Sequence, residues 1–346
     1  MATELPLDVH FLIIEWVFRS SQHTDIDYIT LHACALVCRA WTPTAQRLLF
    51  RRIYCTSVED KDCDIQGLIR TLSTSPHLVA LIRYIQVAWP SCPPDYGNAC
   101  LRLLELCPHV EGISFLGWSY NNRPLSPEMD ARMRAIQLKP AFINVAGLDD
   151  TIGTAILKMW PRVRTLILDG RYTCPLPPTV ESAEIFAALG EYRWFSKPLP
   201  VLRDLCLTWP KWTDKALCQH VLSADFLPRL QSLHLNTEFP PQDILDLLIQ
   251  LRSLVVGQLP WKPVVLPQSL HHVGYHPGGA SVSAVSAELA VYPLRALPEL
   301  QLVTAMRFVE QQVWAALEGM CCERRIGFET YASFHSFQEP RYADWI

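Results

Sequence analysis

The residues best suited to metal chemistry are three histidines near the end of the chain, His271, His272 and His276. A structural zinc site takes four ligands, usually including paired cysteines or acidic side chains. These histidines would therefore need at least one further ligand from elsewhere in the chain. Histidines on a short strand and its exit are more often surface groups, so the sequence predicts no metal site and no cofactor.

Nucleophilic chemistry has equally little support. Cys34 and Cys38 lie on one face of a predicted helix, but a reactive cysteine needs a neighbouring histidine or a helix amino terminus to lower the pKa of its thiol. The sequence contains no Gly-x-Ser-x-Gly, no glycine-rich phosphate loop, no His-Glu-x-x-His and no Cys-x-x-Cys. It predicts no catalytic residue, and we expect a binding protein and not an enzyme.

The net charge and the share of charged residues limit which classes of partner such a protein is expected to bind. The chain has 346 residues, enough for two domains or one elongated repeat array, and its net charge is −4. Its two basic doublets, Arg51-Arg52 and Arg324-Arg325, are predicted to be solvated helix ends, so nucleic acid is not expected as a partner. The charged share of 18% is below the roughly 25% of an ordinary globular domain, which predicts an apolar surface covered by another protein.

Membrane insertion and disulfide bonds are also not expected. The apolar run from Phe11 to Val17 is interrupted by Glu15 and is far shorter than the roughly 20 residues that span a bilayer. Twelve cysteines at irregular spacing, behind an acidic and proline-containing start, predict reduced thiols. We therefore expect a cytoplasmic or nuclear protein.

Residues 5 to 53 are predicted to form three short helices. The second runs from about Tyr28 to Trp41, and the third starts where Thr42 can cap free amide groups and Pro43 fits the first helical turn. Three helices in about 50 residues make a marginal core, so this unit is expected to bind a partner. Apolar residues recur at helical spacing on the first helix, namely Val9, Leu12, Ile13, Trp16 and Val17.

From residue 76 a pattern Leu-x-x-Leu-x-Leu recurs, with short strands alternating with helix-like segments. One such unit cannot bury its own apolar side, so the units are predicted to stack into a solenoid with a parallel sheet on its concave wall. The asparagine that usually ties successive turns together is mostly missing, which predicts an irregular array. The predicted strands are Ile82-Ile85-Val87, Val110-Ile113-Phe115, Val163-Leu166-Leu168, Leu202-Leu205-Leu207, Leu230-Leu233-Leu235, Leu251-Leu254-Val256, Leu270-Val273-Tyr275, Leu297-Leu300-Leu302 and a degenerate Ile143-Val145; the predicted helices are Asn98–Cys107, Thr151–Trp160, Thr213–Ser223 and Gln242–Leu248.

Three sequence blocks in the amino-terminal region resemble a known motif. They are Leu5-Pro6-Leu7-Asp8-Val9, then Leu36-Val37-Cys38-Arg39-Ala40-Trp41, then Leu48-Leu49-Phe50-Arg51-Arg52-Ile53. In this order, and followed by leucine-rich repeats, they resemble the F-box proteins with carboxy-terminal leucine-rich repeats that are abundant in fungi. Asp8 stands where glutamate is commoner.

The resemblance implies an α/β architecture with a three-helix F-box at residues 1–55, a connecting helix or linker at 56–75 and leucine-rich repeats with a capping tail at 76–346. It implies that the F-box binds the Skp adaptor and, through it, a cullin and a RING protein, so that the chain selects a protein substrate for a ubiquitin ligase. A ubiquitin-independent scaffold is the alternative. The residues matching the Skp-binding positions of the family are Leu5, Pro6, Val9, Ile13, Val37, Cys38 and Leu48, and Trp41 is expected to pack between the second and third helices.

The substrate is expected on the concave wall of the repeats. In a leucine-rich solenoid the side chains next to the central strand anchors face that wall. Here they are polar and uncharged overall, so no strongly acidic or basic substrate is predicted. They are Tyr84, Gln86, Asp204, Cys206, Ser232, His234, Ser253, Val255 and His272.

Overall fold

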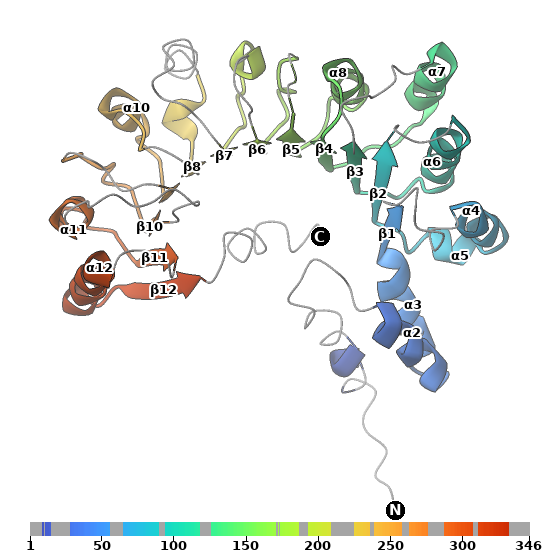
Figure 1. The fold of residues 1–346 in the computed structure, drawn as a ribbon, viewed down its shortest axis with the longest axis horizontal. Helices are drawn as coiled ribbons and strands as arrows, with labels where there is room; N and C mark the ends of the chain where they lie inside the picture. Colours follow the sequence, from blue (N-terminus) through green and yellow to red (C-terminus); the bar gives the residue numbers. More distant parts are fainter. Residues whose placement is uncertain are drawn as a thin grey trace, which may run out of the picture. The chain divides into compact units, whose positions relative to one another are not determined.

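The computed structural model is divided by its internal packing into two compact units, one built on Met1–Pro140 and the other on Ala141–Trp345. We describe each unit separately (Figure 1). The residues that the structure describes are 9, 11–14, 28–55, 65–89, 94–117, 126–170, 172, 174–186, 193–208, 225–235, 239–257, 263–275, 287–306 and 311–331.

The first unit joins a helical pair to a three-stranded parallel sheet in the order β1-β2-β3. Helices α4 to α7 lie on one side of this sheet (Figure 1). The elements are α2 (Tyr28–Val37), α3 (Thr42–Arg51), β1 (Arg52–Cys55), α4 (Ile65–Thr74), α5 (Pro76–Val79), β2 (Tyr84–Trp89), α6 (Pro94–Leu106), β3 (Gly112–Gly117) and α7 (Pro127–Ala135).

The second unit is a parallel sheet in which β4 to β12 follow one another in chain order. Its long helices all lie on the same side of the sheet (Figure 1). The strands are β4 (Phe142–Ala146), β5 (Thr165–Asp169), β6 (Ser182–Phe186), β7 (Asp204–Thr208), β8 (Ser232–Leu235), β9 (Ser253–Val256), β10 (His272–Tyr275), β11 (Leu302–Met306) and β12 (Gly327–Tyr331); the helices are α8 (Asp150–Met159), α10 (Gln242–Leu247), α11 (Ala287–Arg295) and α12 (Gln311–Arg324), with 3-10 turns at Arg193–Phe195 and Leu227–Arg229.

A shared backbone carbonyl sets the register between neighbouring strands. The carbonyl of Arg203, just before β7, accepts hydrogen bonds from the amides of Gln231 (2.7 Å) and Ser232 (3.0 Å), just before and at the start of β8. Gln231 in turn accepts from Arg252 and Ser253. Because most strands begin at such a fixed point, alternate side chains such as Leu205 and Leu207 enter the core, as expected for parallel strands in register.

A tight turn precedes most strands and brings the chain to this starting point. In Leu227-Pro228-Arg229-Leu230 the amide of Leu230 donates to the carbonyl of Leu227 at 3.2 Å, and proline at the second position fixes the backbone angle that such a turn requires. The same closure occurs in Trp160-Pro161-Arg162-Val163 (3.3 Å), Leu199-Pro200-Val201-Leu202 (3.3 Å) and Leu248-Ile249-Gln250-Leu251 (3.2 Å).

Tyr172 ties two repeats together. Its buried hydroxyl lies 3.3 Å from the carbonyl of Val145, 3.2 Å from that of Asp169 and 3.4 Å from the amide of Leu148. The ring fits only because Gly153 of α8 has no side chain, since a Cβ at this position would collide with it. Burial raises the pKa of this phenol, so it remains a hydrogen-bond donor.

Most of the predicted repeats are confirmed as strands, including the degenerate Ile143-Val145 as β4. Helices α6, α8 and α10 overlap three predicted helices, and Thr213–Ser223 lies outside the described residues. The prediction for β11 was wrong by three residues. Val303 and Ala305 are the strand residues that enter the core, in register with Val273 and Tyr275, while Leu297 and Leu300 belong to the preceding turn.

Among the described helices, none combines the length and the apolarity needed to cross a bilayer.

Three strands were not predicted: β1, β6 and β12. In β6 the core positions are Ala183 and Ile185 around the buried Glu184, which weakens the apolar pattern. Strand β1 begins directly after α3, and Ile53 therefore belongs to a strand and not to the third predicted helix.

Replacing Tyr172 with phenylalanine removes the hydroxyl that links β4 to β5. We expect a loss of about 1–2 kcal/mol in the free energy of unfolding, since buried backbone groups lose their partner. That loss corresponds to a thermal midpoint lower by about 2–8 °C. Scanning calorimetry of the full chain should detect this change, whereas Tyr292→Phe, at an exposed phenol, should leave the midpoint unchanged. Equal midpoints for Y172F and the parent chain would contradict the role of the hydroxyl.

Candidate functional site

Helices α2 and α3 form a small bundle with its own core. Buried Leu31 and Cys34 of α2 pack against Ala45 and Leu48 of α3, together with buried Ile14. Trp41 is half-buried and packs against this core at the junction of the two helices. The expected packing of Trp41 between the second and third helices is therefore confirmed.

The opposite face of α2 is also apolar, and it is exposed. Ile29 is 86% exposed, Leu36 73% and Val37 63%, and their spacing of seven and eight residues places them on one side of the helix. We call these three side chains the α2 apolar face. A helix that is apolar on both sides is typically covered on both sides, so this face has the character of a binding surface.

The short segment 11–14 adds further exposed apolar side chains. Leu12 is 65% exposed, and Phe11 and Ile13 are each 38% exposed. On this segment it is Ile14 that is buried, a residue outside the predicted apolar face, while Leu12 and Ile13 of that face are exposed and Val9 is half-buried. Trp16 and Val17 of the predicted face lie outside the described residues.

The predicted Skp-binding residues fall into four groups. Ile13, Val37 and Cys38 are exposed, and Val9 is half-buried, whereas Leu48 is buried in the bundle core. Leu5 and Pro6 lie outside the described residues. Ile29 was not identified from the sequence as a surface residue. Leu12 was placed in the core, and Leu36 was treated only as part of the motif. Apolar residues on all sides of α2 could have indicated a second contact surface.

Thr42 does not cap α3 as predicted. Its hydroxyl donates instead to the carbonyls of Ala35 (2.8 Å) and Cys38 (3.1 Å), and the amino-terminal cap of α3 is Trp41, which makes no side-chain capping bond. The Thr42 hydroxyl therefore satisfies carbonyl groups at the end of α2, which ends at Val37 and not near Trp41 as predicted.

The bundle is joined to the sheet without an intervening linker, because β1 starts at Arg52, one residue after α3 ends. The hydroxyl of Tyr28 in α2 donates to the carbonyl of Arg52 at 3.1 Å. The rings of Tyr28, Tyr54 and Tyr84 then form a chain, with centroids 6.4 and 6.1 Å apart, from α2 through β1 to β2. Arg52 is half-buried among these rings, and burial lowers its pKa, so the prediction of a solvated helix end at Arg51-Arg52 was wrong for Arg52.

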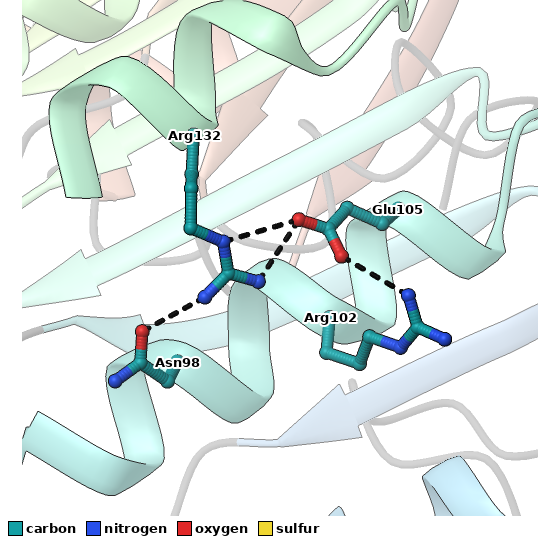
Figure 2. A network of polar contacts seen from close by, with 4 residues as sticks. All are labelled: Asn98, Arg102, Glu105 and Arg132. Atoms are coloured by element: carbon teal, nitrogen blue, oxygen red, sulfur yellow. Dashed lines mark hydrogen bonds and ion pairs between the residues drawn. The ribbon is translucent and has the colours of Figure 1, made fainter. Parts of the chain in front are cut away.

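A polar network fastens α7 to α6 in the same unit (Figure 2). The guanidinium of Arg132 donates through Nε (3.3 Å) and Nη2 (2.9 Å) to one oxygen of Glu105, and through Nη1 to the amide oxygen of Asn98 at 2.9 Å. Arg102 contacts the other oxygen of Glu105 at 3.3 Å. These partly exposed contacts fix the orientation of α7. The charges of Arg102, Glu105 and Arg132 are paired with one another within the unit.

The predicted target-binding residues lie on the sheet face opposite the helices or on the corresponding face of β2. Cys206, Ser232, His234 and Val255 of the second unit are buried, as is Tyr84 of the first. Asp204, Ser253 and His272 of the second unit and Gln86 of the first are half-buried. In the second unit Glu184, Cys206 and His234 stand in register on β6, β7 and β8, so the centre of this face carries buried titratable groups, and sequence reasoning missed Glu184.

The histidines singled out in the sequence are engaged in separate contacts. His271 lies 2.8 Å from a carboxylate oxygen of Glu299, while the ring of His272 bridges the hydroxyls of Ser253 (2.8 Å) and Thr304 (3.0 Å). His276 lies outside the described residues. In the part of the chain that the structure describes, no group of three or more His, Cys, Asp or Glu side chains is placed to hold a metal ion.

Several cysteines are buried in a way that suppresses nucleophilic character. Burial raises the pKa of Cys107 to about 12 and that of Cys321 to about 11, and it raises the pKa of Cys174 as well. These three thiols are therefore protonated at neutral pH, and the thiolate is the reactive form.

Comparison with known proteins does not place the chain in a family. No family model matches the sequence, and no curated protein matches it. Among solved structures, the crystal structure of a structural-genomics target from Bacteroides fragilis is similar with a TM-score of 0.42 and 13% sequence identity, over 81% of this chain and 73% of that one. A similarity of this size carries no argument about function.

The two faces of α2 should respond differently to substitution. Leu31→Ala, in the bundle core, should destabilise the bundle by about 2–5 kcal/mol, because it leaves a cavity. Leu36→Ala, on the α2 apolar face, should change stability by no more than about 0.5 kcal/mol. Hydrogen exchange of the α2 and α3 amides in the full chain measures both, and similar acceleration by the two changes would contradict the division into core and surface.

Proposed function

We propose that this protein is an F-box adaptor, which binds a Skp-type protein through its amino-terminal helices and a protein substrate through its parallel-sheet repeats. The observation that carries the proposal is the α2 apolar face on a bundle that already has a separate core. The three sequence blocks described above supply the resemblance to F-box proteins, and the repeated strands after them agree with a leucine-rich array.

The energetics favour a protein partner for the α2 apolar face. Fully burying a valine, leucine or isoleucine side chain contributes roughly 1.5–3 kcal/mol, so Ile29, Leu36 and Val37 together can offset much of the entropic cost of association. Helix α2 contains no Asp, Glu, Lys or Arg, which suits the apolar centre of a stable interface, although exposed His32 lies beside Ile29 and Leu36.

The direct junction between α3 and β1 supports the same function. An adaptor must hold a substrate at a defined place relative to the ligase. The Tyr28–Arg52 hydrogen bond and the tyrosine chain restrict motion between the bundle and the first strands. We propose that the same connection orients the bound Skp protein relative to the start of the repeats, in the cytoplasm or the nucleus, and that ubiquitin transfer is carried out by the associated cullin and RING proteins.

The adaptor interaction can be tested by co-expression with a Skp protein. Leu36→Asp and Val37→Asp should each weaken binding by at least about tenfold, because burying an aspartate on an apolar interface replaces favourable apolar burial with the cost of removing a charge from water. Gln66→Asp, at an exposed position of α4, is the matched control and should bind like the parent chain. Affinity is measured by calorimetry on the purified full chain.

Undiminished Skp binding by both α2 variants would rule out this surface as the contact. The ubiquitin outcome is tested separately by proximity labelling of proteins that accumulate on the L36D chain in cells. A captured protein whose lifetime is the same with the parent chain and with L36D would favour the scaffold alternative over the ligase adaptor.

A further inference from the structure

A row of side chains runs along the amino-terminal edge of the sheet in the second unit. These residues stand immediately before successive strands and are linked through the shared carbonyls: Arg203 accepts from Gln231 (2.7 Å), Gln231 from Arg252 (2.8 Å) and Arg252 from His271 (2.8 Å). Successive members therefore lie about one strand spacing apart, roughly 4.8 Å. We call the members Arg164, Glu181, Arg203, Gln231, Arg252 and His271 the edge row.

The chain matches cations in this row with carboxylates from the adjacent repeat. Nε of Arg164 lies 3.8 Å from a carboxylate oxygen of Glu181, the next member of the row. His271 lies 2.8 Å from Glu299, in the turn before the next strand. In the first unit Arg83 and Glu111, at equivalent positions before β2 and β3, are 3.4 Å apart.

The pattern is interrupted at Arg203 and Arg252. Both are exposed, and neither has an ion pair or a side-chain hydrogen bond with the described part of the chain. The position between them is Gln231, which is half-buried and neutral. The side chains of Arg203 and Arg252 therefore start about two strand spacings apart, roughly 10 Å. Gln231, which lies between them, supplies no carboxylate.

The nearby acidic groups have other contacts. Asp225 pairs with Arg229 at 3.2 Å and accepts a hydrogen bond from the amide of Leu199. Asp204 follows Arg203 but belongs to the strand, where its half-buried side chain is directed to the face opposite the helices. Glu181 is the carboxylate that pairs with Arg164.

We propose that Arg203 and Arg252 bind an acidic side chain of a substrate protein, whose carboxylate takes the place over Gln231 that a glutamate fills elsewhere along the row. This inference rests on the proposed function, because it assigns the repeats a protein ligand, and it replaces the expectation of a substrate without strong charge. Exposed guanidinium–carboxylate pairs contribute little energy individually, so the edge row contributes more to the selection and orientation of an acidic segment than to its affinity.

Gln231 provides a specific test of this geometry. In Gln231→Glu the chain supplies the missing carboxylate itself, between the two arginines, as Glu181 does beside Arg164. The substitution should keep or raise the thermal midpoint, since it relieves repulsion between two cations, and it should exclude an external carboxylate. If this edge bound acidic peptides only through its overall positive charge, removing any one of its arginines would weaken peptide binding equally.

The experiment measures fluorescence anisotropy of a labelled peptide of alternating Glu and Ala with the purified full chain at low ionic strength, where exposed charges are least screened. A peptide of alternating Gln and Ala and one of alternating phosphoserine and Ala are the comparison probes. We expect the Glu peptide to bind and the Gln peptide not to bind. R203Q, R252Q and Q231E should each weaken binding of the Glu peptide by about threefold to fivefold, the change that a pair worth up to about 1 kcal/mol produces.

Arg162→Gln is the matched control, because it removes an exposed arginine from the same sheet edge, in the turn before β5, that has no ion pair with the described residues. Loss of binding in R162Q as large as in R203Q, or unchanged binding in Q231E, overturns the site. Much tighter binding of the phosphoserine peptide with the same arginine dependence overturns the assignment to a carboxylate. Skp binding is measured in parallel, and R203Q and R252Q should bind Skp like the parent chain. A parent chain that binds Skp but not the Glu peptide refutes this inference alone, and a parent chain that binds the peptide but not Skp refutes the adaptor function alone.

Discussion

The shared carbonyl before each strand is the contact on which the repeat architecture depends. One oxygen accepts two amides from the following repeat, so both the starting point and the direction of that strand are set by the strand before it. Each repeat can be positioned in this way although it is too small to hold a core alone. The alternation between core side chains and side chains on the other face then follows in every strand without further specification.

At the amino terminus, a different constraint produces the candidate binding surface. The α2–α3 bundle has room in its core for only one side of α2, and Leu31 and Cys34 occupy it. Ile29, Leu36 and Val37 are consequently left on the surface, although they are as apolar as the core residues. The direct continuation of α3 into β1 means that any partner bound to this face is connected through a few hydrogen bonds and ring contacts to the first strands.

Sequence periodicity was sufficient to predict most strands and their parallel stacking, because Leu, Ile and Val at two-residue spacing enter the core in most repeats. It failed where the core position is small, as at Ala183, or where leucines of the turn imitate a strand, as at Leu297 and Leu300. It also could not predict that Tyr172 ties two repeats together, since the tyrosine reaches three backbone groups from outside any strand. The division of the α2 residues between core and surface required the position of α3, which no local pattern contains.

The connections between strands differ greatly in length, and the fixed turn explains why the sheet tolerates this. In the repeats that have this turn, only the segment from the turn to the end of the strand, such as residues 199–208, determines the register. Between the end of β5 at Asp169 and the start of β6 at Ser182 the described residues form no helix, whereas α11 lies between β10 and β11. The outer part of each repeat is therefore free to lengthen, shorten or change its secondary structure during evolution, while the edge row keeps its spacing. The proposed ligand contacts of this row can consequently change by single substitutions without a change in the register of the strands.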